Sequence, residues 1–307
     1  MNTKELLERI EKDNVKFISL QFTDVAGTVK SVDMPVRNFP DAAEDGVWFD
    51  GSSVAGFGRI QESDMRLIVD KDTYAVLPWS PEERRRARVF CDVYTPDGEP
   101  FEGDPRGTLK RMLAKIAKRG WTLNIGAEPE FFLFKRGNGS GVHPVPHDVG
   151  GYFDFSANDE AVRVRTELME ALDEMGLDIE VGHHEVALGQ HEIDFRYDDA
   201  LRIADNILTL KYTVKAIAAQ NGLVASFMPK PIFGVNGSGM HCNQSLFNLD
   251  GTNAFADETD ELKLSEIAYQ SGFEDSNYFS RQFKARIDMS PSAYRRRYRD
   301  LDQKRSR

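Results

Sequence analysis

The stretch 122–134 constrains the fold more than any other part of the sequence. It is typical of a β-strand, and the two-residue period of a strand places Glu128 and Glu130 on one face, while apolar residues dominate the remainder of the stretch. Two carboxylates held side by side repel each other unless a cation lies between them. The stretch therefore predicts a sheet strand with an acidic face suited to a cation.

Strands and helices alternate after residue 100, and this order predicts an α+β catalytic domain built on one sheet. The expected strands are 122–134, 179–197, 223–228 and 239–247, and the expected helices are 105–118, 158–175 and 199–221. Residues 1–100 predict a smaller mixed module, with a helix over 3–12 capped by Thr3, strands over 17–23, 28–34, 67–69, 74–77 and 89–93, and a Gly/Ser loop over 50–58. We expect three domains, 1–100, 101–260 and 261–307, the last a small all-α tail.

Composition excludes several classes of protein. A hydrophobic fraction of 40% and a charged fraction of 29% argue against global disorder. No apolar run approaches the ~18 residues that span a bilayer, and the first residues resemble a charged amphipathic helix rather than a signal peptide. Cys91 and Cys242 are far apart and indicate neither a disulfide framework nor a zinc site. We therefore expect a cytoplasmic protein with no membrane partner.

Charge divides the chain near residue 261. Residues 262–307 carry eleven Lys and Arg against six Asp and Glu, a net charge of +5, which leaves −16 on residues 1–261. An acidic body with a basic tail indicates two functions or two origins. The charge difference alone, however, is also explained by a basic tail that is simply solvated and has no function of its own.

Further candidate ligands come after the first strand. A bend at Leu188 and Gly189 would direct Glu185 and Glu192 into the same space, and His241 follows a glycine-rich turn. Several glutamates with one histidine form a ligand set suited to Mg²⁺ or Mn²⁺. Taken singly, each glutamate also fits a solvated strand face, and His241 also fits a hydrogen-bonded core position.

Four segments resemble, in order and spacing, the signatures of type I glutamine synthetases of bacteria and archaea. They are 49–53, 126–131, 185–193 and 230–241. The resemblance extends from the N-terminus to about residue 257. It implies an N-terminal β-grasp domain, a catalytic domain, and a homo-oligomer in which subunits form a double hexameric ring with active sites between neighbours.

The resemblance implies that ATP phosphorylates glutamate to a γ-glutamyl phosphate and that ammonia then displaces the phosphate, with Mg²⁺ or Mn²⁺ neutralising charge. Glutamate, ammonium and ATP would be the substrates. By the same resemblance, one metal would be held by Glu130, Glu185 and Glu192, and the second by Glu128 and His241. Glutamate would be bound by Asn236 and Gly237, and nucleotide by Tyr152, Glu180 and Ser245.

The implied catalytic residue is Asp50, which would reach into a neighbouring subunit and draw a proton from ammonium. Its local alternative is an Asx-type turn into Gly51. The family pattern stops after residue 255, whereas complete members continue through phosphate-clamping arginines, a flap glutamate and a third ligand of the second metal. We therefore expect impaired ligase activity.

The remaining segment has a different character. Residues 264–273 and 276–284 predict a helix, a glycine-containing turn and a second helix, and Ser290-Pro291 then starts a third helix. Residues of about 262–300 resemble the second helix-turn-helix of AraC-type transcription regulators. By this resemblance, the DNA contacts would come from Ser276, Asn277, Ser280, Arg281 and Lys284. The first helix-turn-helix of such a domain is not present, so any DNA binding is expected to be weak.

The sequence is compatible with three functions. The leading one is a glutamate–ammonia ligase whose body is a C-terminally incomplete glutamine synthetase. The second is a DNA-binding transcription regulator that uses the tail, although the acidic body would repel DNA. The third is an inactive fusion or a misassembled reading frame. From periodicity alone, the tail also fits a helical cap on the preceding domain.

Overall fold

The computed structural model describes residues 1–57, 64–137, 144–155, 160–255, 264–273 and 275–294. The chain divides into two compact units. The first consists of Met1–Arg119 and Leu123–Gln244, and the second of Gly120–Thr122 and Ser245–Arg307. Within the described ranges, no helix is both long and apolar enough to cross a bilayer.

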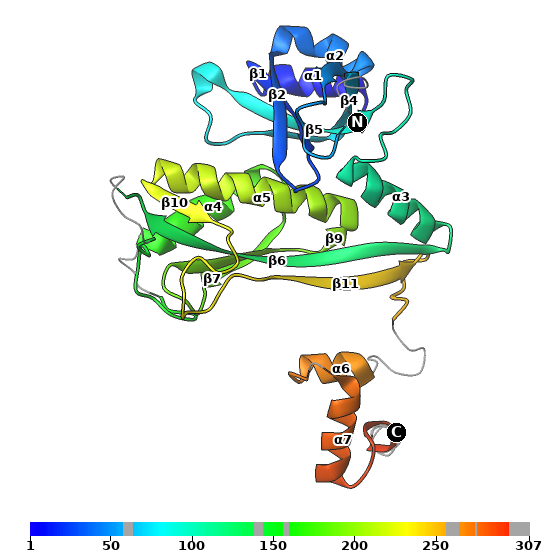
Figure 1. The fold of residues 1–307 in the computed structure, drawn as a ribbon, viewed down its shortest axis with the longest axis vertical. Helices are drawn as coiled ribbons and strands as arrows, with labels where there is room; N and C mark the ends of the chain where they lie inside the picture. Colours follow the sequence, from blue (N-terminus) through cyan, green and yellow to red (C-terminus); the bar gives the residue numbers. More distant parts are fainter. Residues whose placement is uncertain (58–63, 138–143, 156–159, 256–263, 274, 295–307) are drawn as a thin grey trace. The chain divides into compact units, whose positions relative to one another are not determined.

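The first unit begins with a five-stranded sheet in the order β2-β1-β5-β4-β3 (Figure 1). Its pairs are antiparallel except for β1 with β5, which is parallel. The strands are β1 Phe17–Thr23, β2 Val29–Pro35, β3 Val47–Asp50, β4 Asp64–Val76 and β5 Arg86–Tyr94, with short 3₁₀ turns at Val36–Asn38 and Glu82–Arg84. Helices α1 (Thr3–Lys12) and α2 (Phe39–Asp45) supply apolar side chains to the same core.

Helix α1 shows how local sequence sets an element. Leu6 and Ile10 are four residues apart, lie on one helical face and are buried. The cap is Asn2 and not Thr3 as predicted, because the Asn2 side chain accepts from the Glu5 backbone N–H at 2.9 Å while the Glu5 carboxylate accepts from the Asn2 N–H at 2.8 Å. This reciprocal capping box satisfies two N–H groups that the helix itself leaves unpaired.

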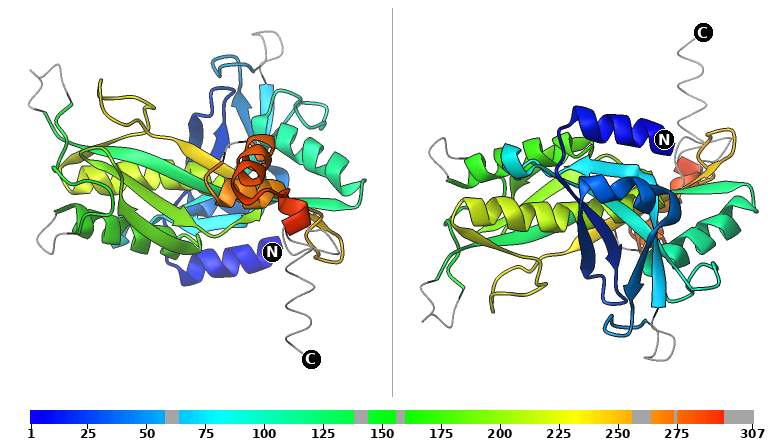
Figure 2. Two further views of the ribbon diagram at one scale, coloured as in Figure 1. Left: turned by 90° about the horizontal axis from the view of Figure 1, so that it is seen from below. Right: turned by 90° about the horizontal axis from the view of Figure 1, so that it is seen from above.

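The second half of the first unit is built on a six-stranded sheet (Figures 1 and 2). Four strands follow the order β10-β6-β8-β7, and β9 and β11 also pair with β6. The strands are β6 Trp121–Lys135, β7 Ile179–His184, β8 Gln190–Phe195, β9 Asp198–Asp199, β10 Leu223–Ser226 and β11 Met240–Asn248. The helices are α3 Pro105–Ala117, α4 Glu160–Glu174 and α5 Ala200–Gln220. The predicted α+β class is confirmed.

Helices α4 and α5 cover one face of this sheet. Leu168 and Leu172 on α4, and Leu210 and Val214 on α5, are pairs spaced four residues apart, so each pair lies on one helical face. All four side chains are fully buried. They pack against the sheet in a single core, which fixes the direction that each strand residue faces.

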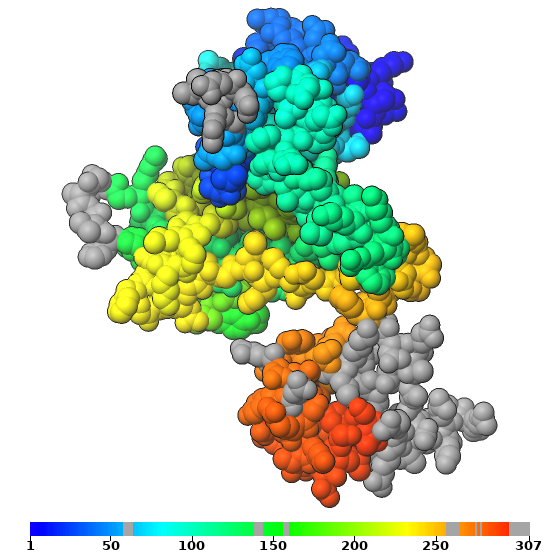
Figure 3. Space-filling model, turned by 45° about the vertical axis from the view of Figure 1, so that its right-hand side comes forward, coloured from blue at the N-terminus to red at the C-terminus, as the bar shows by residue number. Residues whose placement is uncertain are grey.

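The two faces of β6 have different environments. Ala127, Phe131 and Leu133 belong to the core beneath the helices. Glu128 and Glu130 alternate with these residues and therefore lie on the opposite face. The sequence prediction of an acidic strand face therefore agrees with the register of the sheet. In Figure 3, the segment that leads from β10 into β11 (yellow) forms part of the outer surface of the first unit.

Strand β4 contributes to two hydrophobic cores. Leu67 in its first half is buried in the core of the five-stranded sheet. Ala75 near its end, and Leu77 just after it, are buried in the core beneath α4 and α5. The pairing of β4 with β5 shifts between Asp70 and Ala75, and near the end of the strand adjacent residues face different cores, since Tyr74 is buried in the first core and Ala75 in the second. One strand thus connects the two halves of the first unit.

The second unit contains the short helix α6 (Leu264–Gln270) and the helix α7 (Ser276–Ile287). Their contact is apolar: Ala268 and Phe279 are buried, and the Phe273 ring lies 5.2 Å from that of Phe279. Ser290 then caps a helical turn, because its side-chain oxygen accepts from the Ala293 N–H at 3.2 Å. The small helical tail is confirmed, and the predicted third helix is described as far as residue 294.

Candidate functional site

Three neighbouring strands place acidic and histidine side chains in one row. Glu130 of β6 is the cross-strand partner of Glu192 of β8, and Glu192 is in turn the partner of His183 of β7. Glu185 follows β7 directly, so its side chain joins the row from the turn. The three glutamates predicted to hold one metal therefore lie along one row, but the ligand atoms that converge are those of His183, Glu185 and Glu192, without Glu130.

His183 is the centre of this group. Its Nε2 lies 3.0 Å from Glu185 Oε1 and 3.3 Å from Glu192 Oε2. One ligand atom from each of the three residues lies within 4.8 Å of the others. This spacing fits donors that surround one cation, and carboxylate oxygens are the donors that Mg²⁺ and Mn²⁺ prefer.

The carboxylates strongly affect one another's protonation. Burial, together with the neighbouring Asp194 and Glu185, raises the pKa of Glu192 to about 9. Burial also raises the pKa of Glu130, with the negative charge of Glu185 adding to the effect. Carboxylates crowded in this way favour either a bound proton or a bound cation. The donor set and its electrostatics therefore fit a divalent metal.

Glu128 and His241, the predicted ligands of the second metal, are also neighbours. His241 Nδ1 lies 3.3 Å from Glu128 Oε2. The Asn243 side-chain amide donates to Glu128 Oε1 at 2.6 Å. Both contacts arise because β11 pairs with β6, which sets residues 240–244 beside the acidic strand. His241 is mostly exposed, so this pair forms the more open part of the site.

Gln190 is fully buried and forms a hydrogen bond with a residue of the acidic row. Its amide nitrogen donates to Glu130 Oε2 at 2.7 Å and to the Gly237 carbonyl at 3.0 Å. It thereby connects the strand to the loop predicted to bind glutamate. In that loop Asn236 is exposed, whereas Gly237 is packed so tightly that a Cβ there would lie 2.3 Å from the Pro229 carbonyl oxygen.

The predicted nucleotide residues are in different settings. The Tyr152 ring is half-exposed and lies 5.8 Å from the His183 ring, at the edge of the acidic row. Glu180 is exposed on β7 and acts electrostatically on Asp194. Ser245 lies on β11 within the second unit and is partly buried.

Asp50, the predicted catalytic residue, ends β3 in the five-stranded sheet. Its Oδ1 accepts from the Ser52 N–H at 2.8 Å, which is the Asx-type turn weighed as its alternative role. Helices α4 and α5 separate its sheet from the acidic face (Figure 1). Within one chain, Asp50 is therefore apart from the metal-ligand candidates.

The predicted DNA-contacting residues all lie on α7. Arg281 and Lys284 are exposed, and Ser276 and Ser280 are partly buried. Asn277 occupies the second position of the helix. The five residues thus lie between the first and the ninth position of α7, and their contact with DNA stays a prediction.

Sequence reasoning missed the roles of three polar residues here: His183, Gln190 and Asp194. Strand periodicity could have found His183, because it is two residues before Glu185, and Asp194, because it is two residues after Glu192. Asp194 Oδ1 is buried without a hydrogen-bond partner, and burial raises the pKa of this carboxyl. Gln190 carried no comparable signal, since its importance comes from contacts with distant segments.

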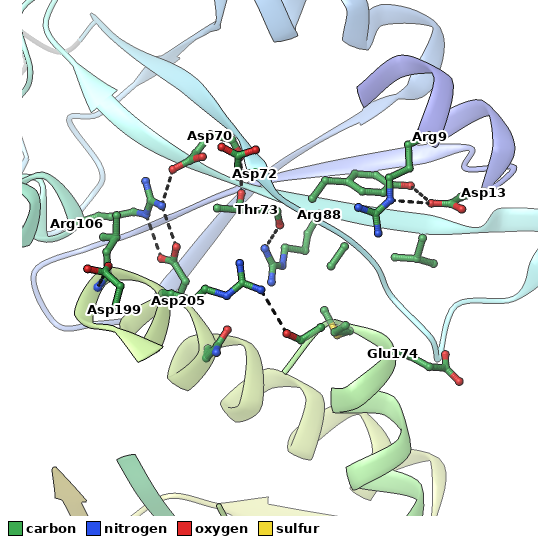
Figure 4. A pocket seen from close by; sticks show the side chains of 18 residues that line it. Arg9, Asp13, Asp70, Asp72, Thr73, Arg88, Arg106, Glu174, Asp199 and Asp205 are labelled. Atoms are coloured by element: carbon green, nitrogen blue, oxygen red, sulfur yellow. Dashed lines mark hydrogen bonds and ion pairs between the residues drawn. The ribbon is translucent and has the colours of Figure 1, made fainter. Parts of the chain in front are cut away.

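A second concentration of charge lines a cavity of about 670 Å³ between β4 and the helices α4 and α5 (Figure 4). Arg106, from the first turn of α3, is 8% exposed. Its guanidinium donates to both oxygens of Asp205 at 3.0 and 2.9 Å, to Asp70 at 2.7 Å and to Asp92 at 2.6 Å. These pairs connect β4 and β5 to α5, so the charges beside the cavity serve the packing of the two sheets.

Models of three protein families match this chain. Glutamine synthetase, catalytic domain, matches residues 102–273, and glutamine synthetase, beta-Grasp domain, matches residues 14–96. Bacterial regulatory helix-turn-helix proteins of the AraC family match residues 256–296.

Individual relatives agree with the first two matches. Glutamine synthetases of Clostridium saccharobutylicum and Halobacterium salinarum are 52% and 51% identical over 87% and 88% of this chain. The chain spans about 60% of the length of these relatives. Among solved structures, Plasmodium falciparum glutamine synthetase superposes with a TM-score of 0.78 at 27% identity, over 89% of this chain and 59% of that one. A GmaS/ADP complex gives 0.77 at 31% identity, over 87% and 61%.

Proposed function

Because the chain belongs to the glutamine synthetase family, with a β-grasp domain, part of the catalytic domain and an AraC-type helical tail, we propose that its acidic face binds divalent cations for the ATP-dependent ligation of ammonia to glutamate. The observation that supports this most is the row formed by Glu130, Glu192 and His183 across three strands, with Glu185 beside it. We further propose the domain limits 1–100, 101–260 and 261–307, a homo-oligomer and a cytoplasmic location.

Each metal-ligand candidate has a defined role in this proposal. Glu130, Glu185 and Glu192 would hold one Mg²⁺ or Mn²⁺, and Glu128 with His241 would hold a second. When bound, such cations neutralise the phosphate charge that develops during phosphoryl transfer to the glutamate γ-carboxylate. Gln190 keeps Glu130 oriented toward the row through its 2.7 Å hydrogen bond.

The other residues would handle the substrates. Asn236 and Gly237 would bind glutamate in the loop that Gln190 anchors. The Tyr152 ring and Glu180, with Ser245, would contact ATP. Asp50 would take a proton from ammonium at a neighbouring subunit's site, which releases ammonia to attack the acyl phosphate.

The metal site offers the most direct test. Only about 60% of the length of the relatives is present in residues 1–307, and we expect glutamine formation by this chain to be much slower than theirs. The three predicted ligands of the first cation, Glu130, Glu185 and Glu192, all lie within these residues.

We expect Mn²⁺ to bind the purified chain in a calorimetric titration at pH 8, and Glu185→Gln to weaken that binding at least about tenfold, because it removes one of three charged oxygen ligands. The matched control is Glu8→Gln on the exposed side of α1, which should leave binding unchanged. Absence of Mn²⁺ binding in the unaltered chain, or equal binding by Glu185→Gln, would contradict the proposal.

The AraC-family match and the apolar packing of α6 on α7 favour DNA binding as a second candidate function. We expect it to be weak, salt-sensitive and nearly independent of DNA sequence, because one helix-turn-helix reads few base pairs and the body carries a net charge of −16. In gel-shift assays, Lys284→Ala should lower the affinity equally for two unrelated duplexes, whereas Lys115→Ala on α3 should not.

Tight binding to one duplex that resists random competitor DNA and disappears in Asn277→Ala would instead identify a sequence-specific regulator. A folded chain that binds neither Mn²⁺ nor DNA would support the third function, an inactive fusion.

A further inference from the structure

A buried polar cluster lies on the face of the sheet opposite the acidic row. His184 on β7 and His191 on β8 are cross-strand partners, each one residue away from a residue of the row. Strand alternation therefore turns them toward α4, where Arg165 contacts His191. Both histidines are at most 1% exposed. Asp148, from the loop before α4, completes the cluster together with its neighbour His147.

Asp148 joins the segments that carry Glu185 and Glu192. Its Oδ1 accepts from the Gly189 N–H at 2.7 Å, within the turn that connects β7 to β8. Both of its oxygens lie 3.1 Å from His184 Nε2. His184 Nδ1 in turn donates to the Glu185 carbonyl at 2.6 Å. A continuous chain of hydrogen bonds thus runs from Asp148 to the backbone of Glu185.

The turn itself has little freedom to adjust. Gly189 has a φ of +69°, and a Cβ at this position would lie 2.8 Å from the Leu133 carbonyl oxygen. The Glu185 N–H donates to the Gln190 carbonyl at 2.8 Å and closes the turn. The backbone between the two glutamates is therefore held both by the turn's own bonds and by Asp148.

Charge supports this arrangement. Burial alone would raise the pKa of Asp148, but its contacts with His147 and His184 hold it well below its usual range, so the group is a carboxylate at neutral pH. His184 Nε2 lies 3.1 Å from both oxygens of this carboxylate. The two groups form a charge-assisted pair, which is stronger than a neutral hydrogen bond.

Ligand atoms of His147, Asp148 and His191 lie within 4.8 Å of one another, but the Arg165 guanidinium beside them opposes a bound cation. A guanidinium only donates, so Arg165, 3.0 Å from His191 Nδ1, requires that nitrogen to accept. The proton of neutral His191 is then on Nε2, the atom that faces His147 and Asp148. A protonated nitrogen cannot ligate a metal, so the cluster acts as a hydrogen-bonded support.

We propose that Asp148 is a positioning residue for the divalent-cation site, which fixes His184 and the turn at Gly189 so that the side chains of Glu185 and Glu192 meet on the opposite face of the sheet. This inference rests on the proposed function. Residues that orient metal ligands without touching the metal are typically worth about 10–100-fold in metal affinity.

The test is Mn²⁺ titration of the full chain, followed by the electron paramagnetic resonance signal of free Mn²⁺, with thermal melting of each variant as a check on folding. We expect Asp148→Ala to weaken Mn²⁺ binding by about 10–100-fold. Asp148→Asn should lose less, because its amide oxygen can still accept from the Gly189 N–H. This graded recovery is a result that mere loss of stability would not give.

Asp104→Asn is the matched control. Asp104 is 1% exposed and caps α3 by accepting from the Arg106 N–H at 3.1 Å, so its loss affects stability without touching the turn. Its Mn²⁺ affinity should equal that of the unaltered chain.

If the unaltered chain and Asp148→Ala bind Mn²⁺ equally well, the inference is wrong and the proposed function stands. If the unaltered chain does not bind Mn²⁺, the proposed function itself fails. Should Asp148→Ala not fold, Asp148→Asn decides, because unchanged affinity in that variant would equally overturn the inference. If Asp104→Asn lost as much Mn²⁺ affinity as Asp148→Ala, the loss would be explained by lower stability of the fold. That result would also overturn the inference.

Discussion

Replacing Arg106 with methionine should lower the free energy of unfolding by about 3–5 kcal/mol, the usual effect of removing one partner from a buried ion-pair network. The Arg106 side chain is 7% exposed and neutralises Asp70, Asp92 and Asp205, two of which come from the first sheet and one from α5. Methionine fills a similar volume but leaves these carboxylates crowded together with less compensating charge. Urea denaturation followed by circular dichroism measures the loss.

The control for this experiment is Arg163→Met on α4. Arg163 pairs with Glu167 at 2.6 Å, but its side chain is 53% exposed, and exposed pairs contribute only about 0–1 kcal/mol. Arg106→Lys keeps the charge but loses the planar fork that reaches several carboxylates at once, so its effect should be intermediate. Equal stability of Arg106→Met and Arg163→Met would show that the network does not hold the two sheets together.

The affinity for Mn²⁺ should rise about tenfold for each pH unit between about 6 and 8. The reason is that the pKa of Glu192 is raised to about 9 in the metal-free protein, by burial first and then by neighbouring carboxylates, so a cation must displace a proton from this group. Above pH 9 the proton is already lost and the rise should level off. Calorimetry in two buffers of different ionisation enthalpy measures the released proton directly.

Stability of the metal-free protein should follow the opposite trend. The folded pKa of Glu192 lies above its ordinary value of 4.5, so its contribution to stability is fully present below pH 4.5 and is lost as the pH rises through about 9. Glu192→Gln should flatten both dependences and weaken Mn²⁺ binding. If Mn²⁺ affinity were independent of pH between 6 and 8, Glu192 would already be ionised in the metal-free protein.

Local signals predicted much of the fold. The strand period located the acidic face of β6. The segment 179–197, predicted as one strand with a bend at Leu188 and Gly189, consists of two strands, β7 and β8, joined at that bend. Helix α5 runs from Ala200 to Gln220 with caps at Asp199 and Asn221, the ends predicted for it. These elements carry strong local patterns that packing reinforces.

Other features depended on distant contacts. Helix α2 was not predicted, because Phe39–Asp45 is short and is held by burial of Phe39 rather than by propensity. Residues 67–69 and 74–77 were predicted as two strands, although both belong to β4 apart from Leu77, since the irregular pairing between them resembles a strand end. Asp148 contacts His184 and Gly189, which are 36 and 41 residues away, and no local pattern reveals these contacts.

The burial of β4 residues in both cores has a consequence for how the first unit unfolds. If the five-stranded sheet opened by itself, β4 would have to withdraw Ala75 from the second core as well as Leu67 from the first. Hydrogen exchange of β4 amides should therefore require opening of the entire first unit, and the two sheets should melt in a single cooperative transition. Destabilising substitutions in the five-stranded sheet would then lower cation binding at the acidic face by increasing the fraction of unfolded molecules. The geometry of the site in the folded molecules would not change.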